Sequence, residues 1–393
     1  MQYDFDREVS RTGTDCYKWD LFHARDGAPR LLPMWVADMD FPCPVPVSEA
    51  LVARAANGIF GYTMKSAAYL DSVVGWMQQR HHWEIKPEWI CVTPGVVPAL
   101  NMLVRTFVAP GEHVLIQPPV YGPFFSAAQS NQAASIPNPL RYANGRYQMD
   151  FDDLQEKLRD PQLKMAILCN PHNPVGRVWT RDELTRFGEL CLEHGVMVVS
   201  DEIHGDLVYR GEQFTPFASL GEAFTQHNII CTAPSKTFNL AGLETSNIII
   251  ADADLRTRFE KTLRSDGLGG INSFGLVATE TAYRRGEEWL EQLIDYLGDN
   301  LRYLEDTFRN EIPQIKVIHP EGTYMIWLDC RALGLDRSAL THLMRDTAGV
   351  VLNDGYAFGP QGEGFQRINI ACPRSILVEG LERIRSAVAT LKQ

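Results

Sequence analysis

Between about residues 89 and 251 the sequence alternates short apolar segments with helical patterns, and this alternation constrains the fold more than any other feature. Six segments have the length and composition of buried strands: WICVT, HVLIQ, MAILCN, VMVVSD, IICTA and SNIIIA. Thr180 can cap one intervening helix, and Glu183 can complete its capping box. Apolar strands separated by helices predict an α/β fold with a mostly parallel sheet covered on both faces. Ligands of such sheets bind at the carboxyl ends of the strands.

A different pattern follows this region. From about residue 287 to residue 311, apolar residues recur every three or four positions, as in one long amphipathic helix. The segment after it predicts a small α+β domain, with strands near 316–319, 325–328 and 367–371 and helices near 338–346 and 376–391. We therefore predict a large domain over 46–285, the connecting helix and a small C-terminal domain over 286–393, and an irregular N-terminal arm over 1–45 that joins the small domain.

Composition excludes several classes of function. The 393 residues include 37 Lys and Arg and 49 Asp and Glu, giving a net charge of -12 without a basic stripe. That balance argues against nucleic acid and anionic membranes as partners. The first residues are charged and unlike a signal peptide, and the apolar runs are too short to cross a bilayer. Eight cysteines occur singly, which indicates no metal site and favours reduced thiols in a cytoplasmic protein.

Polar residues stand where four of the predicted strands end. They are the TPGVV segment Thr93–Val97, Asn173 in CNPHNPVG, Asp201 in VMVVSDEIH and Lys236 in TAPSKTFNLAGL. Each alone has an ordinary explanation as a cap, a turn residue or a solvated side chain. Together, in this order and at the ligand-binding edge of the sheet, they indicate a functional site.

The order of these residues resembles a known family. A Gly95 loop, Tyr121, Asn173, Asp201, Ser235–Lys236 and Arg367 follow one another as in the fold type I pyridoxal 5′-phosphate (PLP) enzymes of the aspartate aminotransferase superfamily. Within that superfamily, motifs spread over nearly the whole chain resemble the cystathionine β-lyases and cystalysin-like C–S lyases: MWVADMDF, FGYT, TPGVVPA, NPHNPVGRVW, SDEIH, APSKTFNLAGL, EGTY and RINIACP. The resemblance implies a PLP-dependent transferase fold, with a large domain and a small C-terminal domain.

The resemblance also implies roles for the residues around the cofactor ring. Lys236 would carry PLP as a Schiff base and shuttle the proton at the substrate Cα. Asp201 would keep the pyridinium nitrogen protonated, so that the ring can accept electrons. Asn173 would bond the ring hydroxyl, and Tyr121 would stack on the ring as a further catalytic group. Arg367 would clamp the substrate carboxylate, with Asn173 and Tyr121 beside it.

The phosphate would be held at the other end of the cofactor. Gly95, Val96 and Val97 would offer backbone N–H groups at a helix N-terminus, and Ser235 a hydroxyl. Tyr62 resembles the tyrosine that reaches the phosphate from a neighbouring subunit, which implies a homodimer with shared sites.

Two positions leave alternatives open, and a third departs from the aminotransferase pattern. Arg374 competes with Arg367 for the substrate carboxylate, and we prefer Arg367 because the family's arginine immediately precedes this strand. His204 either tunes the cofactor or is an ordinary core histidine. Glu244 stands eight residues after Lys236, where aminotransferases usually carry an arginine for the phosphate, so we expect its carboxylate to turn away from the phosphate.

The resemblance implies a PLP-dependent carbon–sulfur lyase. Its reaction would be α,β-elimination on L-cystathionine, L-cysteine or S-substituted cysteines, giving pyruvate, ammonia and a thiol. One alternative is a PLP-dependent aminotransferase, which uses the same groups and keeps the side chain of its substrate. Another is a lyase with an additional regulatory role through a protein partner. The absence of the aminotransferase arginine at Glu244 favours the lyase.

Overall fold

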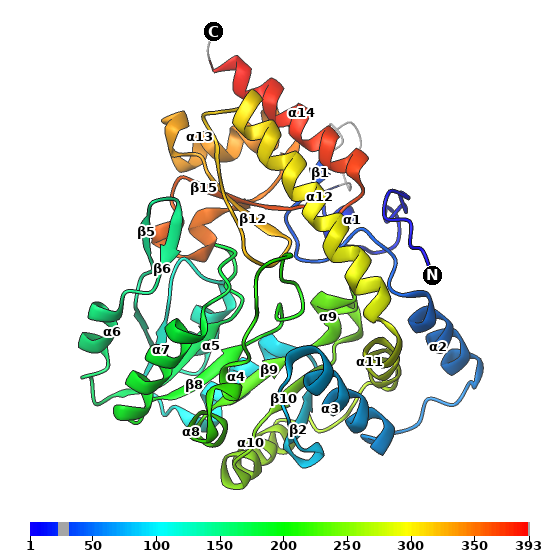
Figure 1. Ribbon diagram of the computed structural model, residues 1–393, viewed down its shortest axis with the longest axis vertical. Coiled ribbons are helices and arrows are strands. Elements are labelled where there is room, and N and C mark those ends of the chain that lie inside the picture. Colours follow the sequence, from blue (N-terminus) through cyan, green and yellow to red (C-terminus); the bar gives the residue numbers. More distant parts are fainter. Residues whose placement is uncertain (23–30, 392–393) are drawn as a thin grey trace.

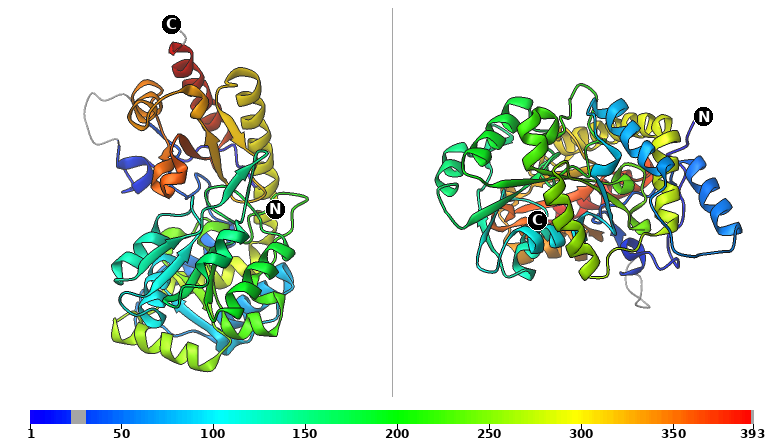
Figure 2. Two further views of the ribbon diagram at one scale, coloured as in Figure 1. Left: turned by 90° about the vertical axis from the view of Figure 1, so that its left-hand side faces the viewer. Right: turned by 90° about the horizontal axis from the view of Figure 1, so that it is seen from below.

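The computed structural model describes residues 1–22 and 31–391 and contains two main sheets, which lie one above the other (Figures 1 and 2). Helix α12 (Glu287–Glu311) runs from beside the larger sheet to the smaller one (Figure 1). Its apolar stripe, from Trp289 to Phe308, is buried as the three-to-four residue spacing predicts. Among the residues described, no helix is both long and apolar enough to cross a membrane.

In the described part of the chain, the larger sheet has seven strands in the order β2-β10-β9-β8-β7-β3-β4. Only β10 runs against its neighbours, so the sheet is mostly parallel, as predicted. The six predicted segments form β2 (Ile90–Thr93), β3 (His113–Ile116), β7 (Leu163–Cys169), β8 (Met197–Asp201), β9 (Ile229–Thr232) and β10 (Ser246–Ile249). No sequence pattern predicted β4 (Ala134–Pro137), because this edge strand is partly exposed and lacks an apolar run.

Both faces of this sheet are covered, because successive strand residues enter two separate cores. In β7, Met165 and Ile167 pack in one core, whereas Ala166 and Leu168 pack in the other. The helices around the sheet are α2 (Val45–Ala56), α3 (Ala67–His81), α4 (Val96–Phe107), α5 (Pro123–Ser130), α6 (Phe151–Lys157), α7 (Arg181–Glu193), α8 (Glu222–His227), α9 (Pro234–Thr237), α10 (Ala253–Ser265) and α11 (Ser273–Arg285). The expected capping box of Thr180 and Glu183 begins α7.

The smaller sheet is antiparallel, in the order β11-β12-β15-β14. Its strands are β11 (Lys316–Ile318), β12 (Met325–Asp329), β14 (Asn353–Asp354) and β15 (Phe365–Asn369), and they are accompanied by α13 (Arg337–His342) and α14 (Arg374–Thr390). The helix expected over 338–346 is regular only to His342 and then continues as a π-turn. Two short pairs complete the strands: β5 (Arg141–Ala143) with β6 (Arg146–Gln148), and β1 (Leu32–Pro33) with β13 (Val350–Val351).

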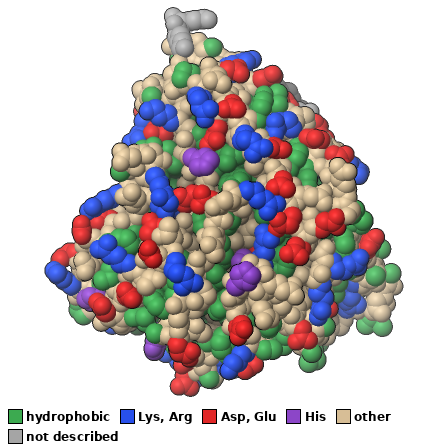
Figure 3. All heavy atoms as spheres, viewed as in Figure 1, with side chains coloured by type: hydrophobic (Ala, Val, Ile, Leu, Met, Phe, Trp, Pro, Cys, Tyr) green, Lys and Arg blue, Asp and Glu red, His purple; other side chains and the backbone are tan. Residues whose placement is uncertain are grey.

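The N-terminal segment crosses the molecule from the smaller sheet to the larger one. It contains the short helix α1 (Tyr17–Asp20), and then β1 pairs with β13 beside the smaller sheet. Residues 35–41 follow β1 directly and lead towards α2, so they pass between the two main sheets. On the face shown in Figure 3, acidic and basic side chains are interspersed, and no basic stripe is visible.

Candidate active site

A cavity of about 300 Å³ lies at the carboxyl ends of the central strands of the larger sheet. Asp201 is the last residue of β8, Asn173 follows β7 by four residues, and Lys236 lies in α9 directly after β9. Residues predicted from sequence line this cavity: Gly95, Val96, Val97, Tyr121, Asn173, Asp201, His204, Ser235 and Lys236. We call the part around Asn173, Asp201 and Lys236 the inner end, and the part around Gly95 and Ser235 the outer end.

Lys236 is held at the inner end by a backbone carbonyl. Its Nζ donates to the Ala37 carbonyl oxygen at 2.7 Å. Burial lowers the pKa of the Lys236 ammonium to about 8, although the charges of Asp38 and Asp201 partly oppose this shift. A substantial fraction of the amine is therefore neutral near physiological pH, which is the form that can act as a nucleophile or a base.

Asp201 is a buried carboxyl group with few partners. Within the described part of the chain it accepts one hydrogen bond, from the Ile203 N–H to Oδ1 at 3.2 Å. Burial raises the pKa of Asp201 to about 7, because the ionised form lacks water and has only this one donor. A cationic N–H group placed against its free oxygen would restore the ionised form.

Arg367 on β15 comes from the smaller sheet and reaches the inner end. Its Nη1 donates to Asn173 Oδ1 at 2.9 Å, and its Nη2 donates to Asn353 Oδ1 at 2.5 Å and to the Trp35 carbonyl at 3.0 Å. Across residues 1–22 and 31–391 no carboxylate forms a salt bridge with this guanidinium, and its Nε has no partner there. Burial lowers the pKa of Arg367 to about 10, as expected for a buried cation without a counter-ion.

The alternative arginine lies elsewhere. Arg374 begins α14, and its Nε donates to Asn300 Oδ1 at 2.7 Å. Its guanidinium also covers the ring of Tyr303, with 4.9 Å between the guanidinium carbon and the ring centre. Arg367 does not itself line the active-site cavity, but its hydrogen-bond partner Asn173 does, whereas neither Asn300 nor Tyr303 lines it. Arg367 therefore lies closer than Arg374 to the residues that would surround a ligand.

Two rings border the inner end. Tyr121 is partly buried, and burial raises the pKa of its phenol. His204 is buried, and burial lowers the pKa of its imidazole to about 3, so the ring is neutral. Its Nδ1 has no hydrogen-bond partner within the described residues, and its ring packs edge-on against Tyr324 at 5.9 Å.

The outer end is formed by backbone at the start of α4. Gly95 precedes this helix with a φ of 112°, a conformation that favours glycine, and Val96 and Val97 open the helix with N–H groups that have no helical acceptor. Ser235 lies nearby on the cavity wall. The helix start thus offers donors and a positive pole to an anion.

The outer end borders a second cavity of about 740 Å³, and Tyr62 lies there. Pro94, Glu244 and Thr245 line both cavities. Tyr62 is fully exposed and does not line the active-site cavity of its own chain. Glu244 is exposed with a left-handed backbone (φ 46°), and whether its carboxylate turns away from a bound phosphate stays a prediction.

The structure also brings in residues 35–41, which the sequence identified only as part of the family motif. The carbonyl of Ala37 accepts from Lys236 and, at 3.0 Å, from the Tyr324 hydroxyl. Asn369 donates to the carbonyls of Val36 and Asp38. Because these contacts use backbone carbonyls, no side-chain pattern could have pointed to them.

A buried ion pair anchors this segment. Asp40 accepts from Lys18 Nζ at 2.6 Å, from Trp19 Nε1 at 2.8 Å and from Arg11 Nη1 at 2.8 Å. Although burial opposes it, the charge of Lys18 together with these bonds lowers the pKa of Asp40. The N-terminal arm therefore helps to hold the carbonyl that receives Lys236.

With this geometry established, comparison with known proteins identifies the family. The model of the family "Aminotransferase class I and II" matches residues 38–384, and the chain belongs to this family. It is 47% identical over 386 residues to "Cystathionine beta-lyase PatB" of Bacillus subtilis (98% of this chain, 100% of the relative). It is 34% identical to "Protein MalY" of Escherichia coli (99% and 100%).

Solved structures agree with this assignment. The chain superposes with a TM-score of 0.96 on cystalysin from Treponema denticola, which contains PLP, at 40% identity and full coverage of both chains. It superposes with a TM-score of 0.92 on the PLP-bound C–S lyase from Staphylococcus hominis, at 34% identity over 99% of this chain and 98% of the other. The predicted family and fold class are thereby confirmed.

Proposed function

We propose that this protein is a PLP-dependent carbon–sulfur β-lyase. It acts on L-cystathionine, L-cysteine or S-substituted cysteines and releases pyruvate, ammonia and a thiol. The observation that carries this proposal is the pairing of a lysine of lowered pKa with a buried carboxylate in one cavity, in a chain 47% identical to a protein named cystathionine beta-lyase.

The cavity fits PLP on three counts. Within the described residues one oxygen of the Asp201 carboxyl accepts no hydrogen bond, so a cationic ring N–H can bond to it. Lys236 presents an amine to the same space. The start of α4 presents anion-binding N–H groups at the opposite end. A carboxylate, an amine and an anion site in this order match the ring nitrogen, the aldehyde and the phosphate.

PLP bound at Lys236 supplies an electron sink for the negative charge that develops at the substrate Cα. In this proposal Lys236 attaches the cofactor and then moves the proton at Cα. Asp201 keeps a proton on the ring nitrogen, Asn173 donates to the ring hydroxyl, and Tyr121 stacks on the ring. His204, neutral and buried, packs beside these groups and tunes the site without carrying charge.

Arg367 binds the substrate α-carboxylate in this proposal, with Asn173 and Tyr121 beside it. Its support is the buried Arg367 guanidinium, which forms no salt bridge within the described residues, because a buried cation without a counter-ion is stabilised by an anionic ligand. Fixing the carboxylate orients the Cα–H bond towards Lys236, and a thiolate is a good leaving group from the adjacent carbon.

We further infer a homodimer in which the partner completes the outer end. Gly95, Val96, Val97 and Ser235 would hold the phosphate from one chain, and Tyr62 of the second copy would reach it. The inference is supported by exposed apolar residues beside the second cavity: Ile59, Phe60, Tyr62 and Met64. A cluster of this kind on one surface is typical of a protein interface.

We propose the division into an N-terminal arm (1–45), a large PLP-binding domain (46–285), and the long helix with the small domain (286–393). The pairing of β1 with β13 supports the assignment of the arm to the small domain. A cytoplasmic location is proposed as well, since all eight cysteines are free thiols and six of them are buried.

The lyase and the aminotransferase are distinguished by their need for a 2-oxo acid. Purified protein is incubated with L-cystathionine, with and without 2-oxoglutarate, and pyruvate, ammonia, thiol and glutamate are measured. We expect pyruvate, ammonia and thiol in equal amounts without the acceptor. Turnover that requires 2-oxoglutarate and yields glutamate would instead make the protein an aminotransferase.

A further inference from the structure

A second buried carboxylate, Asp206, lies five residues after Asp201 in the loop that follows β8. It accepts three side-chain hydrogen bonds: from Trp76 Nε1 at 3.1 Å, from His81 Nε2 at 2.8 Å and from Thr237 Oγ1 at 2.6 Å. Unlike Asp201, it does not line the active-site cavity. Its partners come from α3 and α9, so this one carboxylate connects three segments of the chain.

Thr237 is the partner with consequences for the chemistry, because it directly follows Lys236 in α9. Thr237 is completely buried, and its hydroxyl bond to Asp206 fixes α9 against the loop after β8. That loop begins directly after Asp201, the last residue of β8. The bond therefore joins the two segments that present Lys236 and Asp201 to the cavity, and it does so outside the cavity itself.

The partners of Asp206 keep its carboxyl group ionised. Burial alone would raise the pKa of Asp206, but the hydrogen bond and charge of His81, the Thr237 hydroxyl and the charge of Arg80 lower it below its usual range. An ionised acceptor makes stronger hydrogen bonds than a neutral one, so the Thr237 tether is of the charge-assisted kind.

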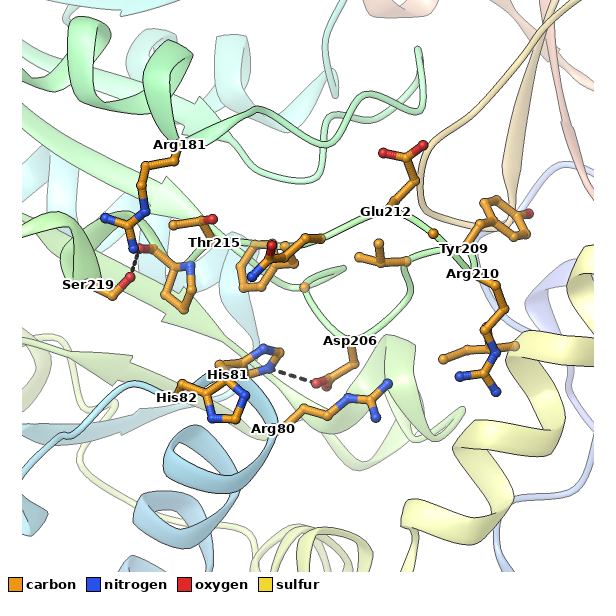
Figure 4. Close-up of a pocket in the computed structure, with 17 residues that line it drawn as sticks. Arg80, His81, His82, Arg181, Asp206, Tyr209, Arg210, Glu212, Thr215 and Ser219 are labelled. Atoms are coloured by element: carbon orange, nitrogen blue, oxygen red, sulfur yellow. Dashed lines mark hydrogen bonds and ion pairs between the residues drawn. The ribbon is translucent and has the colours of Figure 1, made fainter.

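His81 reaches Asp206 from a different side. It ends α3 and lines a polar cavity of about 420 Å³, together with Arg80, His82 and Arg210. Figure 4 shows the His81 ring directed at the Asp206 carboxylate in the wall of this cavity. Phe214 packs edge-on against the same ring at 5.1 Å and restricts it. Asp206 thus stands between this surface cavity and α9.

We propose that Asp206 is a positioning residue for the reaction: through Thr237 it holds Lys236 in register with Asp201. Among the described residues, the Lys236 amine makes one hydrogen bond, to the Ala37 carbonyl, and the bond from Thr237 to Asp206 ties the next residue of α9 to the loop after β8. Displacement of a reacting group by a fraction of an ångström lowers turnover without weakening substrate binding. This inference rests on the proposed attachment of PLP to Lys236.

The test removes the Thr237 hydroxyl from the holoenzyme. Thr237→Val preserves the side-chain shape and leaves Asp206 with its two other donors. The visible circular dichroism of the bound cofactor, per mole of PLP, reports how the linkage on Lys236 is held in its asymmetric site. We expect this signal to fall and kcat to decrease about ten-fold, while KM changes by less than about two-fold. Thr237→Ser, which keeps the hydroxyl, restores both.

Thr279→Val is the matched control. Thr279 is also completely buried, but its hydroxyl donates to the Gly275 carbonyl within α11. This variant should lose stability without changing the circular dichroism or kcat. If Thr237→Val does not fold, the smaller Thr237→Ala takes its place.

Three outcomes are distinguishable. A wild-type protein that acquires no visible cofactor band refutes the proposed function itself. A normal wild-type band, with Thr237 variants that keep its circular dichroism and kcat, overturns the positioning role. Loss of both signals in Thr237→Val and Thr237→Ala, with recovery in Thr237→Ser, supports it.

Discussion

The two ends of the active-site cavity differ in how completely one chain builds them. At the inner end, Asn173, Lys236 and Arg367 have hydrogen-bond partners from residues 35–41 or from the smaller sheet, and Asp201 is buried beside them. At the outer end, backbone N–H groups face a cavity that opens onto the exposed Tyr62. The side chains of the inner end are held in place by contacts within one chain. The outer end has room for a side chain from a second copy of the protein.

The difference between the two ends of the cavity has a physical reason. Charge that develops during a reaction is best stabilised by groups fixed in advance and shielded from water. A phosphate dianion needs only donors and a positive pole, which an exposed helix start provides. Changes at the inner end should therefore affect the reaction far more than changes at the outer end.

The largest effect is expected at Lys236. Lys236→Ala should lose the covalent attachment of PLP completely, because no other amine lines the cavity within the described residues. Borohydride reduction followed by peptide mass spectrometry measures the attachment, and wild-type protein should carry the label on Lys236. Wild-type protein that stays colourless after incubation with PLP would refute the whole assignment.

Asp201 should show opposite effects with and without the cofactor. In the PLP-bound enzyme, Asp201→Asn should lower kcat by about 100-fold or more, because the ring nitrogen loses its ionised partner. Binding of PLP should persist through the remaining contacts. A variant with near wild-type kcat would remove Asp201 from this role.

In the PLP-free protein the same variant should be stabilising. The folded-state pKa of Asp201, about 7, lies above that of an unfolded aspartate, about 3.9, so the unfolded chain loses its proton first as pH rises. Ionisation of Asp201 therefore lowers the free energy of unfolding of the wild-type protein as pH rises from about 4 to 7. Asparagine does not ionise, so the variant does not lose this stability. Thermal unfolding should show an advantage for Asp201→Asn that grows up to pH 7 and is constant above it.

Arg367 tests the part of the inner end that comes from the smaller sheet. Arg367→Ala should raise KM by the equivalent of a lost charged hydrogen bond, about 1.5–3 kcal/mol, since the substrate carboxylate would lose its cation. Arg374→Ala is the control, because Arg374 bonds Asn300 outside the cavity. A rise in KM for Arg374→Ala with none for Arg367→Ala would exchange the two assignments.

The proximity of Asn173, Asp201 and Lys236 could be predicted from the sequence, for a reason visible in the fold. Asn173, Asp201 and Lys236 follow apolar strands, and parallel strands bring their carboxyl ends to the same edge. Their positions after successive parallel strands therefore predict that they lie close together in space. Arg367 belongs to another sheet, and its place beside Asn173 came only from the family resemblance.

Other parts of the site leave no such pattern. The carbonyl of Ala37 receives Lys236, yet any residue could supply that oxygen. Asp206 stands in the SDEIHGD segment like an ordinary loop residue, and its role depends on Thr237 and His81, which are 31 and 125 residues away. Contacts between residues so far apart in the sequence depend on how the helices pack on the sheet. The spacing of apolar residues along the chain does not specify that packing.

The smallest effect is expected at Tyr62, and it decides whether the outer end is completed by a second copy. Tyr62→Phe removes one hydroxyl and should weaken PLP binding by about 1 kcal/mol, roughly five-fold in Kd, if the hydroxyl bonds the phosphate. Fluorescence titration of the PLP-free protein measures this change. Tyr356→Phe, at another exposed tyrosine, should leave Kd unchanged.

A mixing experiment then assigns Tyr62 to a subunit. Lys236→Ala protein is combined with Tyr62→Ala protein at a PLP concentration where each alone is inactive. In a mixed dimer, the site that uses Lys236 of the Tyr62→Ala chain receives Tyr62 from the Lys236→Ala chain, so one site of two regains both groups. Activity should therefore return as subunits exchange, because the outer end needs only a donor placed from across the interface. A fully active monomer in sedimentation, or no recovery in dimers shown to be mixed, would mean that one chain completes the outer end by itself.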